Sequence, residues 1–498
     1  MRSMLPRGAD DARNSTTGSY RWWLLVVTSL GALLASLTSG TLVIALPDIL
    51  RDLHTDIFSL LWIVVGYTLV TTVLVLNAGR LADAIGRATA YTIGFAIFLV
   101  ASVLCALAPT AIALIAARLI QGVGGAFLMA TSAALVTDAF PRRELGRALG
   151  INAMVVGAGL ILGPIVGGFL TSFGWRTVFW FNVPIALIGT IAAWAILVDP
   201  PRRRTGLSID WTGSALYLVG LMGLMTALAF GGIYGWTTPW VLAGFLAFVV
   251  AAPAFLWVEL RKPDPLLDLS LFRIRLFAMG NLTGLLNGIA RNGVLFLLVF
   301  YLQGAKGDDP VTAGLLLSPL AVGLLVLSPI SGALADRYGS RGLATLGMIV
   351  TGIGLVGLTT LQLDTPYWQL AIWQLVIGAG SGLFNSPNTS AVMGVVPPAQ
   401  RGVGAGARMM LTSSGFVVSI ALAIGLVTSA MDPKVLLSVF SGTQIGTSGI
   451  DLAPFISSLH IAFAAGVVAS VVGAGVSFMR GEHASWEDHA AADIGRAA

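Results

Sequence analysis

Gly79-Arg-Leu-Ala-Asp83-Ala-Ile-Gly86-Arg87 is a short polar stretch between two long apolar ones, and the organisation of the chain follows from it. A second copy reads Gly332-Ala-Leu-Ala-Asp336-Arg-Tyr-Gly339-Ser-Arg341. Each matched glycine and aspartate of the second copy lies 253 residues after its partner. Internal repetition of this kind predicts that the chain consists of two related halves.

The composition places most of the chain in lipid. Of 498 residues, 56% are hydrophobic and 10% are charged, and the mean hydropathy is +0.88. A soluble domain carries about 25% charged residues. Cys105 is the single cysteine, which excludes an intramolecular disulfide. The net charge of +5 comes from cations scattered between apolar runs, so we expect no nucleic-acid partner.

A membrane-spanning helix needs roughly 20 mostly apolar residues, and the sequence offers fourteen such runs. The predicted class is therefore an all-α integral membrane protein. The first run begins directly after Arg21 and is too long for a signal-peptide core. The predicted spans are 22–46, 58–78, 89–108, 111–136, 148–172, 176–198, 212–232, 237–258, 276–302, 311–333, 342–362, 367–393, 403–430 and 458–479.

The distribution of Lys and Arg predicts the orientation in the membrane. An even number of spans places both termini on one side, and that side carries 21 of the cations outside the spans, against four on the other. By the positive-inside rule, both termini and both repeated motifs are cytoplasmic, in a multi-pass protein of the cell membrane. Three arginines remain within spans: Arg118, Arg291 and Arg408.

The repeat interval locates an insertion. Six spans with their connectors take roughly 190 residues, at about 30 for each, so about 60 residues are extra. The predicted domains are a cytoplasmic tail (1–21), a six-helix bundle (22–198), two inserted helices with cytoplasmic linkers (199–275), a second six-helix bundle (276–480) and a cytoplasmic tail (481–498). Parallel repeats of this kind are typical of transporters, whose site lies between the halves near the middle of the membrane.

Several motifs in this order resemble the major facilitator superfamily, and specifically its fourteen-span drug/proton antiporter branch, over about residues 20–480. The Gly79 motif resembles the signature between spans two and three. The other matching segments are Leu114-Ile-Ala-Ala-Arg118-Leu-Ile-Gln121-Gly122-Val-Gly124 in span four, Gly157-Ala-Gly159-Leu-Ile-Leu-Gly163-Pro164-Ile-Val-Gly167-Gly168 in span five, and Trp175-Arg176 with Phe179 and Asn182-Val-Pro184.

The resemblance implies roles for these motifs. Asp83, with Gly79, Gly86 and Arg87, is expected to form a cytoplasmic latch with the segment that begins near Arg401-Gly402. The second copy, with Gly332, Asp336, Gly339 and Arg341, is expected to act in the same way. Span five is expected to be a gating helix, in which Gly157, Gly163 and Gly167 allow close helix packing and Pro164 allows a bend. The alternatives are an ordinary solvated turn for each copy and ordinary helix packing for span five.

The sequence departs from this branch in its acidic residues. Thr38 stands where the first-span motif of the branch usually carries an aspartate, ahead of Ala45-Leu46-Pro47. All 23 acidic residues fall in loops, tails or span ends, so no carboxylate is predicted within the middle of the membrane. Proton coupling is then expected to use span-end acids such as Asp48 or Asp138, or to be absent.

Polar residues share one helical face in several spans and must turn away from lipid. Because ionisable residues inside a membrane are costly and usually functional, these faces are candidates for a substrate cavity. Interhelical hydrogen bonding within one half is the alternative for each. The candidates are Arg118, Gln121 and Gly122 in span four, Asn281, Asn287, Arg291 and Asn292 in span nine, Gln374, Asn385 and Asn388 in span twelve, Arg408 in span thirteen, and Thr38.

The common enzyme motifs are missing from the sequence. The three lysines precede Pro263, Gly307 and Val435, so no phosphate loop for a nucleotide is present. There is no His-Glu-x-x-His, no cysteine pair and no Gly-x-Ser-x-Gly. We therefore expect neither an enzyme nor a cofactor or metal site.

The two-halved scaffold predicts a secondary transporter that works by alternating access. The resemblance implies that it exports drugs or amphiphilic small molecules, with protons as the coupling ion. A cavity with arginines and no buried acid favours anionic, neutral or zwitterionic substrates over cationic ones. Two alternatives stay open: a uniporter or importer of a polar metabolite, and a non-transporting membrane sensor or lipid-handling protein.

Overall fold

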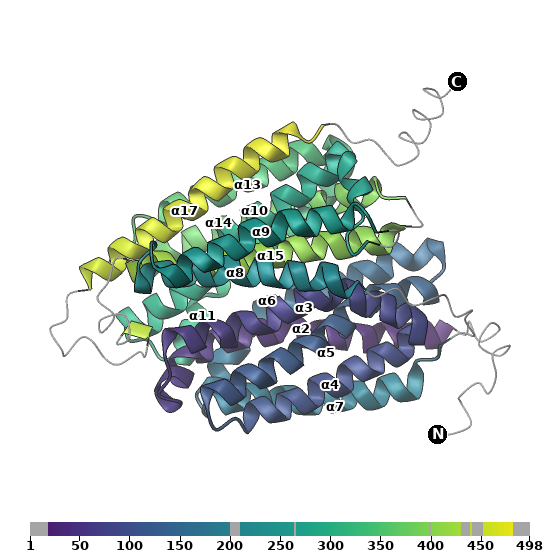
Figure 1. Ribbon diagram of the computed structural model, residues 1–498, viewed down its shortest axis with the longest axis horizontal. Coiled ribbons are helices and arrows are strands. Elements are labelled where there is room, and N and C mark those ends of the chain that lie inside the picture. Colours follow the sequence, from purple (N-terminus) through teal and green to yellow (C-terminus); the bar gives the residue numbers. More distant parts are fainter. Residues whose placement is uncertain are drawn as a thin grey trace. The chain divides into compact units, whose positions relative to one another are not determined.

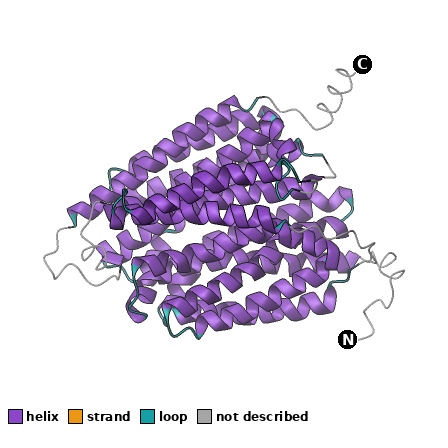
Figure 2. Cartoon of the chain, viewed as in Figure 1, coloured by secondary structure: helices purple, strands orange, loops and turns teal. Residues whose placement is uncertain are grey.

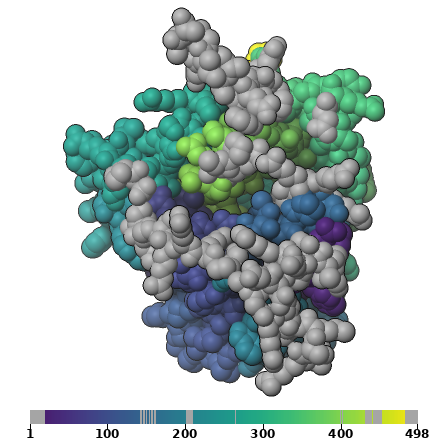
Figure 3. Space-filling view, turned by 90° about the vertical axis from the view of Figure 1, so that its right-hand side faces the viewer, coloured from purple at the N-terminus to yellow at the C-terminus, as the bar shows by residue number. Residues whose placement is uncertain are grey.

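The computed structural model describes residues 18–199, 210–262, 265–397, 400–429, 439–440 and 452–481. The remaining residues are drawn in grey in Figure 3. Every regular element in the described ranges is helical (Figure 2). This confirms the prediction of an all-α chain.

Two compact units divide the chain. Unit 1 comprises Met1–Leu42 and Trp62–Asp210, and unit 2 comprises Val43–Leu61 and Trp211–Ala498. The helices of the first part of the chain are α2 (Gly18–Asp52), α3 (Ile57–Ile85), α4 (Arg87–Ala106), α5 (Ala111–Ala139), α6 (Arg142–Thr171) and α7 (Arg176–Ile196) (Figure 1).

The second part begins with the two helices that were predicted to be inserted, hereafter called the inserted helices. They are α8 (Trp211–Tyr234) and α9 (Pro239–Glu259), followed by the short η2 (Leu269–Arg273). The remaining elements are α10 (Arg275–Val299), which continues as the π-helix η3 (Phe300–Ala305), α11 (Pro310–Leu316), α12 (Ser318–Tyr338), α13 (Ser340–Leu358), α14 (Tyr367–Gly394), α15 (Arg401–Ser429) and α17 (Ala453–Met479).

Twelve of the fourteen predicted spans are helices long and apolar enough to cross a membrane, judged on the described residues. The other two are the predicted spans 148–172 and 367–393. In the first, the apolar helix is the shorter segment Leu162–Thr171 within α6. The second is α14, whose 28 residues include Gln374, Ser381, Asn385 and Asn388. Polar candidates were predicted in α14, and such residues lower the hydropathy by which a span is recognised.

Aromatic side chains pack with aliphatic ones in the core of unit 1. Tyr91 and Phe95 of α4 pack edge to face with ring centroids 5.1 Å apart, and both are buried. The Tyr91 hydroxyl donates to the Thr28 carbonyl of α2 (2.9 Å). A buried tyrosine needs such a partner for its hydroxyl, so this bond fixes α4 against α2.

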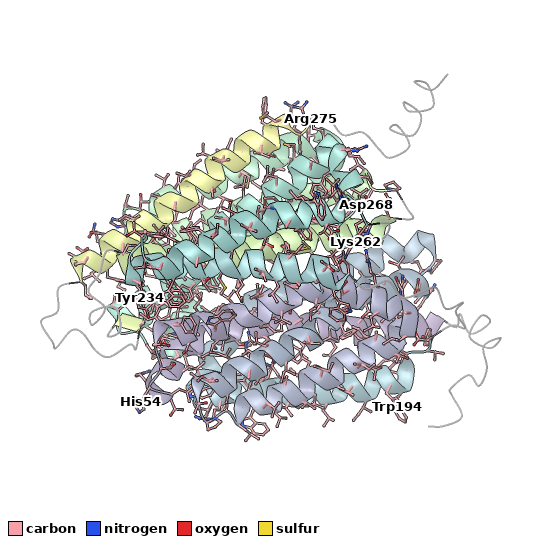
Figure 4. The ribbon with its side chains drawn as sticks, viewed as in Figure 1. His54, Trp194, Tyr234, Lys262, Asp268 and Arg275 are labelled. Atoms are coloured by element: carbon pink, nitrogen blue, oxygen red, sulfur yellow. The ribbon has the colours of Figure 1, made fainter. Side chains whose placement is uncertain are left out.

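The inserted helices pack within unit 2, where α8 lies against α9 and α15 (Figure 1). A Cβ atom at Gly425 would lie 1.9 Å from the Leu228 carbonyl oxygen, and one at Gly232 would lie 2.1 Å from the Gly425 carbonyl oxygen. The backbones of α8 and α15 are therefore in contact, as small residues allow in membrane helices. Figure 4 shows Lys262, Asp268 and Arg275 at one end of unit 2 and Tyr234 at the other.

The hairpin 43–61 also belongs to unit 2. The Gln303 side chain, in the π-helix η3, donates its Nε2 to the Ile44 carbonyl (3.0 Å). The Phe58 and Phe230 rings lie 4.8 Å apart. Proline at position 47 inside α2 removes one backbone donor in this part of the helix. The compact units therefore differ from the predicted domain ranges at this hairpin and at the inserted helices.

Candidate functional site

The first motif copy is built on two helix ends. Residues up to Ile85 belong to α3, and α4 begins at Arg87, so Gly86 alone forms the turn. The Arg87 Nε donates to Asp83 Oδ1 (2.8 Å), and its Nη1 lies 2.9 Å from Asp138 Oδ2. One guanidinium thus bridges carboxylates from α3 and α5. The predicted contact of Asp83 with the segment near Arg401 stays a prediction.

Asp199, which the sequence analysis missed, holds the start of α4. Its carboxylate accepts hydrogen bonds from the backbone N–H groups of Ala88 (2.8 Å) and Thr89 (2.9 Å) and from the Thr89 hydroxyl (2.7 Å). Carboxylates stabilise helix N-termini because the first N–H groups have no partner within the helix. Gly86 has a φ of +109°, and a Cβ there would lie 2.1 Å from Asp199 Oδ2. The glycine of the motif is therefore required by both backbone conformation and space.

Asp199→Ala is expected to loosen the first turn of α4. Loss of a capping side chain costs about 1 kcal/mol, which corresponds to roughly fivefold faster exchange of the amides it protects. Hydrogen exchange of the backbone N–H groups of Ala88 and Thr89 measures this directly. Asp199→Asn is the matched control, because asparagine caps a helix about as well as aspartate. Unchanged exchange in the alanine variant would contradict the capping role.

The second motif copy has a different local chemistry. Gly339 has a φ of +80° and joins α12 to α13, as Gly86 joins α3 to α4. The position that matches Arg87 is Ser340. Arg341 instead donates its Nε to the Phe478 carbonyl of α17 (2.7 Å) and stacks on the Phe478 ring (4.3 Å). Gly332 and Asp336 lie in α12, and the Asp336 side chain lies outside the described residues.

Arg118 of α5 forms a polar network inside unit 1. The guanidinium donates from Nε to the Ile63 carbonyl (3.1 Å) and from Nη1 to Gln121 Oε1 (2.5 Å). The Gln121 Nε2 in turn donates to Ser102 Oγ (3.0 Å). The guanidinium also lies 4.7 Å from the Tyr67 ring centroid, within the range of a cation–π contact. Arg118 and Gln121 are fully buried. Interhelical bonding of this kind was the alternative prediction for span four.

Gly122 allows α5 to approach α3. A Cβ atom at Gly122 would lie 2.7 Å from the Tyr67 carbonyl oxygen and 2.9 Å from Val70 Cβ. The Thr71 hydroxyl donates across this contact to the Gly122 carbonyl (3.0 Å). The span-four motif therefore combines a buried cation with the glycine that brings the neighbouring helix within its reach.

The predicted gating helix α6 meets α2 backbone to backbone. A Cβ at Gly163 would lie 2.8 Å from Gly40 Cα, and one at Gly167 would lie 2.7 Å from Thr41 Cα. Pro164 packs at the same crossing, with its Cδ 3.3 Å from a Cβ built at Gly40. Gly157 lies in α6, one turn or more before this contact. Where α2 and α6 cross, glycines thus allow the two main chains to come into contact without side chains between them.

Thr38 is buried in α2, with 1% of its surface exposed. Its hydroxyl donates to the Leu34 carbonyl of the same helix (2.7 Å). Threonine at this position thus satisfies its polar group locally and supplies no charge.

The polar side chains of α10 divide into two groups. Asn281 and Asn287 are buried and bond inside unit 2, to the Phe277 carbonyl (2.9 Å) and to Met348 Sδ (3.4 Å). Arg291 and Asn292 are half-buried. The Arg291 Nη2 donates to Asn292 Oδ1 (3.2 Å), while its buried Nε has no hydrogen-bond partner among the described residues.

In α14, the three candidate residues have different surroundings. The Gln374 Nε2 donates to the Leu316 carbonyl (3.0 Å), and Asn385 is half-buried. Asn388 donates its Nδ2 to the Gly280 carbonyl (3.0 Å) and accepts from Arg480 Nη1 (3.1 Å). Asn388 thereby connects α10, α14 and the end of α17.

Arg480 was predicted to lie at the cytoplasmic surface, and the structure shows it 1% exposed. Within the described ranges its Nε and Nη2 have no hydrogen-bond partner. Burial, together with the positive charge of Arg341, lowers the pKa of Arg480 to about 10. The sequence signal was weak, because an arginine directly after an apolar run is usually an interfacial anchor.

Arg408 of α15 is half-buried, and its buried Nε has no partner within the described part of the chain. None of the ion pairs formed by described residues involves Arg118, Arg291 or Arg408. The buried acids of the described ranges, Asp210 and Glu259, lie at helix ends. No group of described residues is suited to hold a metal ion.

Comparison with known proteins places these features in a family. The family model of the Major Facilitator Superfamily matches residues 28–210 and 211–420. The riboflavin transporter RibZ of Clostridioides difficile (strain 630) is 33% identical over 77% of this chain and 83% of its own length. The methylenomycin A resistance protein of Streptomyces coelicolor is 34% identical over 81% of this chain and 85% of its own length.

A solved structure shows the same fold. The crystal structure of the POT family transporter PepTSo superimposes with a TM-score of 0.65 and covers 92% of this chain and 98% of its own. Its sequence identity is 14%, so this likeness bears on the fold alone. Twelve candidate spans, the fold and the family model agree. The chain belongs to the Major Facilitator Superfamily, and it is a secondary membrane transporter and not an enzyme.

Proposed function

We propose that the protein is a fourteen-span exporter of drugs or amphiphilic small molecules, which alternates access between the two sides of the cell membrane with protons as the coupling ion. Resistance and export proteins among its relatives support this direction of transport. The proposed membrane arrangement keeps both termini in the cytoplasm. The predicted roles of the motif residues belong to the same proposal.

The charge of the buried polar residues supports a class of substrate. Arg291 and Arg408 each keep a buried Nε without a partner among the described residues. A buried Nε without a partner on a charged guanidinium is costly, and an anionic group on a substrate relieves that cost through charge-assisted hydrogen bonds. The proposed substrates are therefore anionic, zwitterionic or neutral amphiphiles. Arg118 contributes less to this inference, because its Nε and Nη1 already donate to the Ile63 carbonyl and to Gln121.

Proton coupling requires a group that gains and loses a proton during transport. The candidates are acids at span ends, among them Asp48, which pairs with Arg51, and Asp138, which binds Arg87. Purified protein in liposomes with an imposed pH gradient tests this step. Substrate flux that is the same with and without the gradient would exclude protons as the coupling ion.

The function itself is tested by a panel of compounds sorted by charge, given to cells with and without the protein. Cells that make the protein are expected to resist anionic or neutral amphiphiles more than cationic dyes. Resistance restricted to cations would overturn the proposed specificity. Uptake of a polar metabolite, driven only by its own gradient, would support the uniporter or importer instead. A sensor or lipid-handling protein would move none of the panel.

Arg291→Gln is expected to reduce transport of anionic substrates at least tenfold, since a charged hydrogen bond contributes about 1.5–3 kcal/mol. Transport of neutral substrates should change less than twofold. The measurement is flux into liposomes for one anionic and one neutral substrate. Arg261→Gln is the control, because Arg261 lies just after the end of α9 and stacks on Trp257 (4.1 Å). Equal loss for both substrates would argue against an anion-binding role.

A further inference from the structure

The Ser419 hydroxyl of α15 makes two hydrogen bonds to the backbone of α10. It accepts from the Gly293 N–H (2.8 Å) and donates to the Ile289 carbonyl (2.6 Å). In an α-helix the N–H of residue 293 pairs with the carbonyl of residue 289. The hydroxyl therefore binds both groups of one helical hydrogen bond. A side chain that enters the backbone ladder in this way is a known cause of helix bending.

Glycines on both helices bring Ser419 to this position. A Cβ at Gly415 would lie 2.5 Å from the Leu285 carbonyl oxygen, and one at Gly288 would lie 3.2 Å from Gly415 Cα. At Gly293, an added Cβ would lie 3.1 Å from Ser419 Oγ. Any side chain at these positions would push the helices apart and withdraw the hydroxyl. Ser419 itself is 4% exposed, so water does not compete for its bonds.

A small cavity lies beside this hydroxyl. Its volume is about 20 Å³, and its lining includes Gly293, Ser419, Ala423, Phe463 and Gly466 from α10, α15 and α17. That volume is enough for about one water molecule. Packing against α15 and α17 is therefore incomplete at Gly293, and the Ser419 hydroxyl is the group of α15 that bonds to the backbone of α10 there.

Arg291 lies in the turn that Ser419 holds. Ile289 lies two residues before Arg291, and Gly293 lies two residues after it. At 100° per residue around the helix axis, Arg291 is therefore about 160° from both, on the opposite face of α10. Its guanidinium binds Asn292, whose Nδ2 donates to the Gly288 carbonyl (2.8 Å). The hydrogen bonds of Arg291 and of Asn292 with described residues thus stay within residues 288–292. The direction of the guanidinium depends on the geometry of this turn.

We propose that Ser419 is a positioning residue for anionic substrates: through the backbone of Ile289 and Gly293 it holds the turn of α10 that carries Arg291. The inference rests on the proposed anion-binding role of Arg291. Ser419 does not touch the substrate. It acts by keeping the unused donors of Arg291 in one orientation, so that less ordering is needed when an anionic group binds.

The test compares Ser419→Ala with Ser419→Thr. Alanine removes the hydroxyl. The rate of backbone amide hydrogen exchange of residues 289–295 should then rise at least tenfold, because the turn has lost two hydrogen bonds. The KM for an anionic substrate should rise five- to tenfold, with the maximal rate and the transport of a neutral substrate within twofold. Threonine keeps the hydroxyl, and the adjacent cavity has room for its methyl group, so this variant should restore both exchange and KM.

Ser429→Ala is the matched control, because the Ser429 hydroxyl bonds to the Gly425 carbonyl of its own helix (2.7 Å). Faster exchange in Ser419→Ala with an unchanged KM would overturn the positioning role and leave the proposed function intact. If Arg291→Gln also leaves the KM for the anionic substrate unchanged, the anion-binding proposal is wrong, and the positioning role is wrong with it. If Ser419→Ala does not fold, Ser419→Thr still tests the proposal. A Ser419→Thr protein that folds like the parent, but whose KM for the anionic substrate changes as much as in Arg291→Gln, would contradict the role of the hydroxyl.

Discussion

Asp83→Asn is expected to lower transport at least tenfold while the protein remains folded in the membrane. Asparagine keeps the shape of the side chain but removes the negative charge that Arg87 Nε binds at 2.8 Å. Asp83 is 53% exposed, so solvent screens the pair and the expected loss of stability is small, about 0–1 kcal/mol. A large loss of transport would therefore reflect the conformational cycle. Flux into liposomes, with surface labelling to show membrane insertion, measures the effect.

The second motif copy supplies the control for this prediction. Asp336→Asn makes the same chemical change, but the position that matches Arg87 is Ser340, and Arg341 binds the Phe478 carbonyl. The second copy thus has serine at the position of the arginine that joins α3, α4 and α5 in the first copy. Its replacement should reduce transport less than threefold. An Asp83→Asn variant as active as the parent would refute the latch.

The positions of most helices are predictable from the sequence because lipid imposes a simple rule. Every backbone polar group within the membrane must be satisfied inside the protein, so a long apolar run is a helix. The predicted ends are less accurate, since a helix continues into water without an apolar signal. Thus α3 extends to Ile85, and the first motif lies largely on a helix, whereas a loop was predicted after residue 78.

The repeat interval predicts that two helices are inserted, but it does not predict where they pack. Their place in unit 2 depends on the main-chain contact of Gly232 with Gly425 and on the bond between the Tyr217 hydroxyl and Ser414. Such contacts join residues nearly 200 positions apart. The sequence around each glycine does not indicate which residue it contacts on the other helix. The partner becomes known only from the three-dimensional structure.

Polar residues in the spans were predicted from the cost of burying them, and the structure adds their partners. Arg118 was identified as a polar residue within a span, and its bonds go to Ile63 of α3 and to Gln121 of its own helix. Asp199 and Arg480 were missed as functional candidates. Both directly follow an apolar run, where a charged residue usually faces water. Their contacts with Thr89 and Asn388 come from distant helices and leave no local pattern.

Gly163→Val is expected to have the largest effect on stability. A Cβ at this position would lie 2.8 Å from Gly40 Cα and 3.2 Å from the Gly40 carbonyl carbon. Because the obstacle is the backbone of α2, no side chain can rotate away, and α2 and α6 must separate. Overpacking of this kind costs typically 1–3 kcal/mol, and the separation removes the neighbouring contact of Gly167 with Thr41 as well. The purified variant should unfold at a lower temperature and show little or no transport.

Gly475→Val is the matched control, since nothing lies within 4 Å of a Cβ atom at Gly475 of α17. The two variants make the same change in a membrane helix, and they differ in whether a second backbone touches the glycine. Gly163→Ala should fall between the parent and Gly163→Val, because a single methyl group already meets Gly40. If Gly163→Val unfolds at the same temperature as Gly475→Val and transports equally well, α2 and α6 do not need main-chain contact. Close packing would then not explain why glycine occupies these positions of the proposed gating helix.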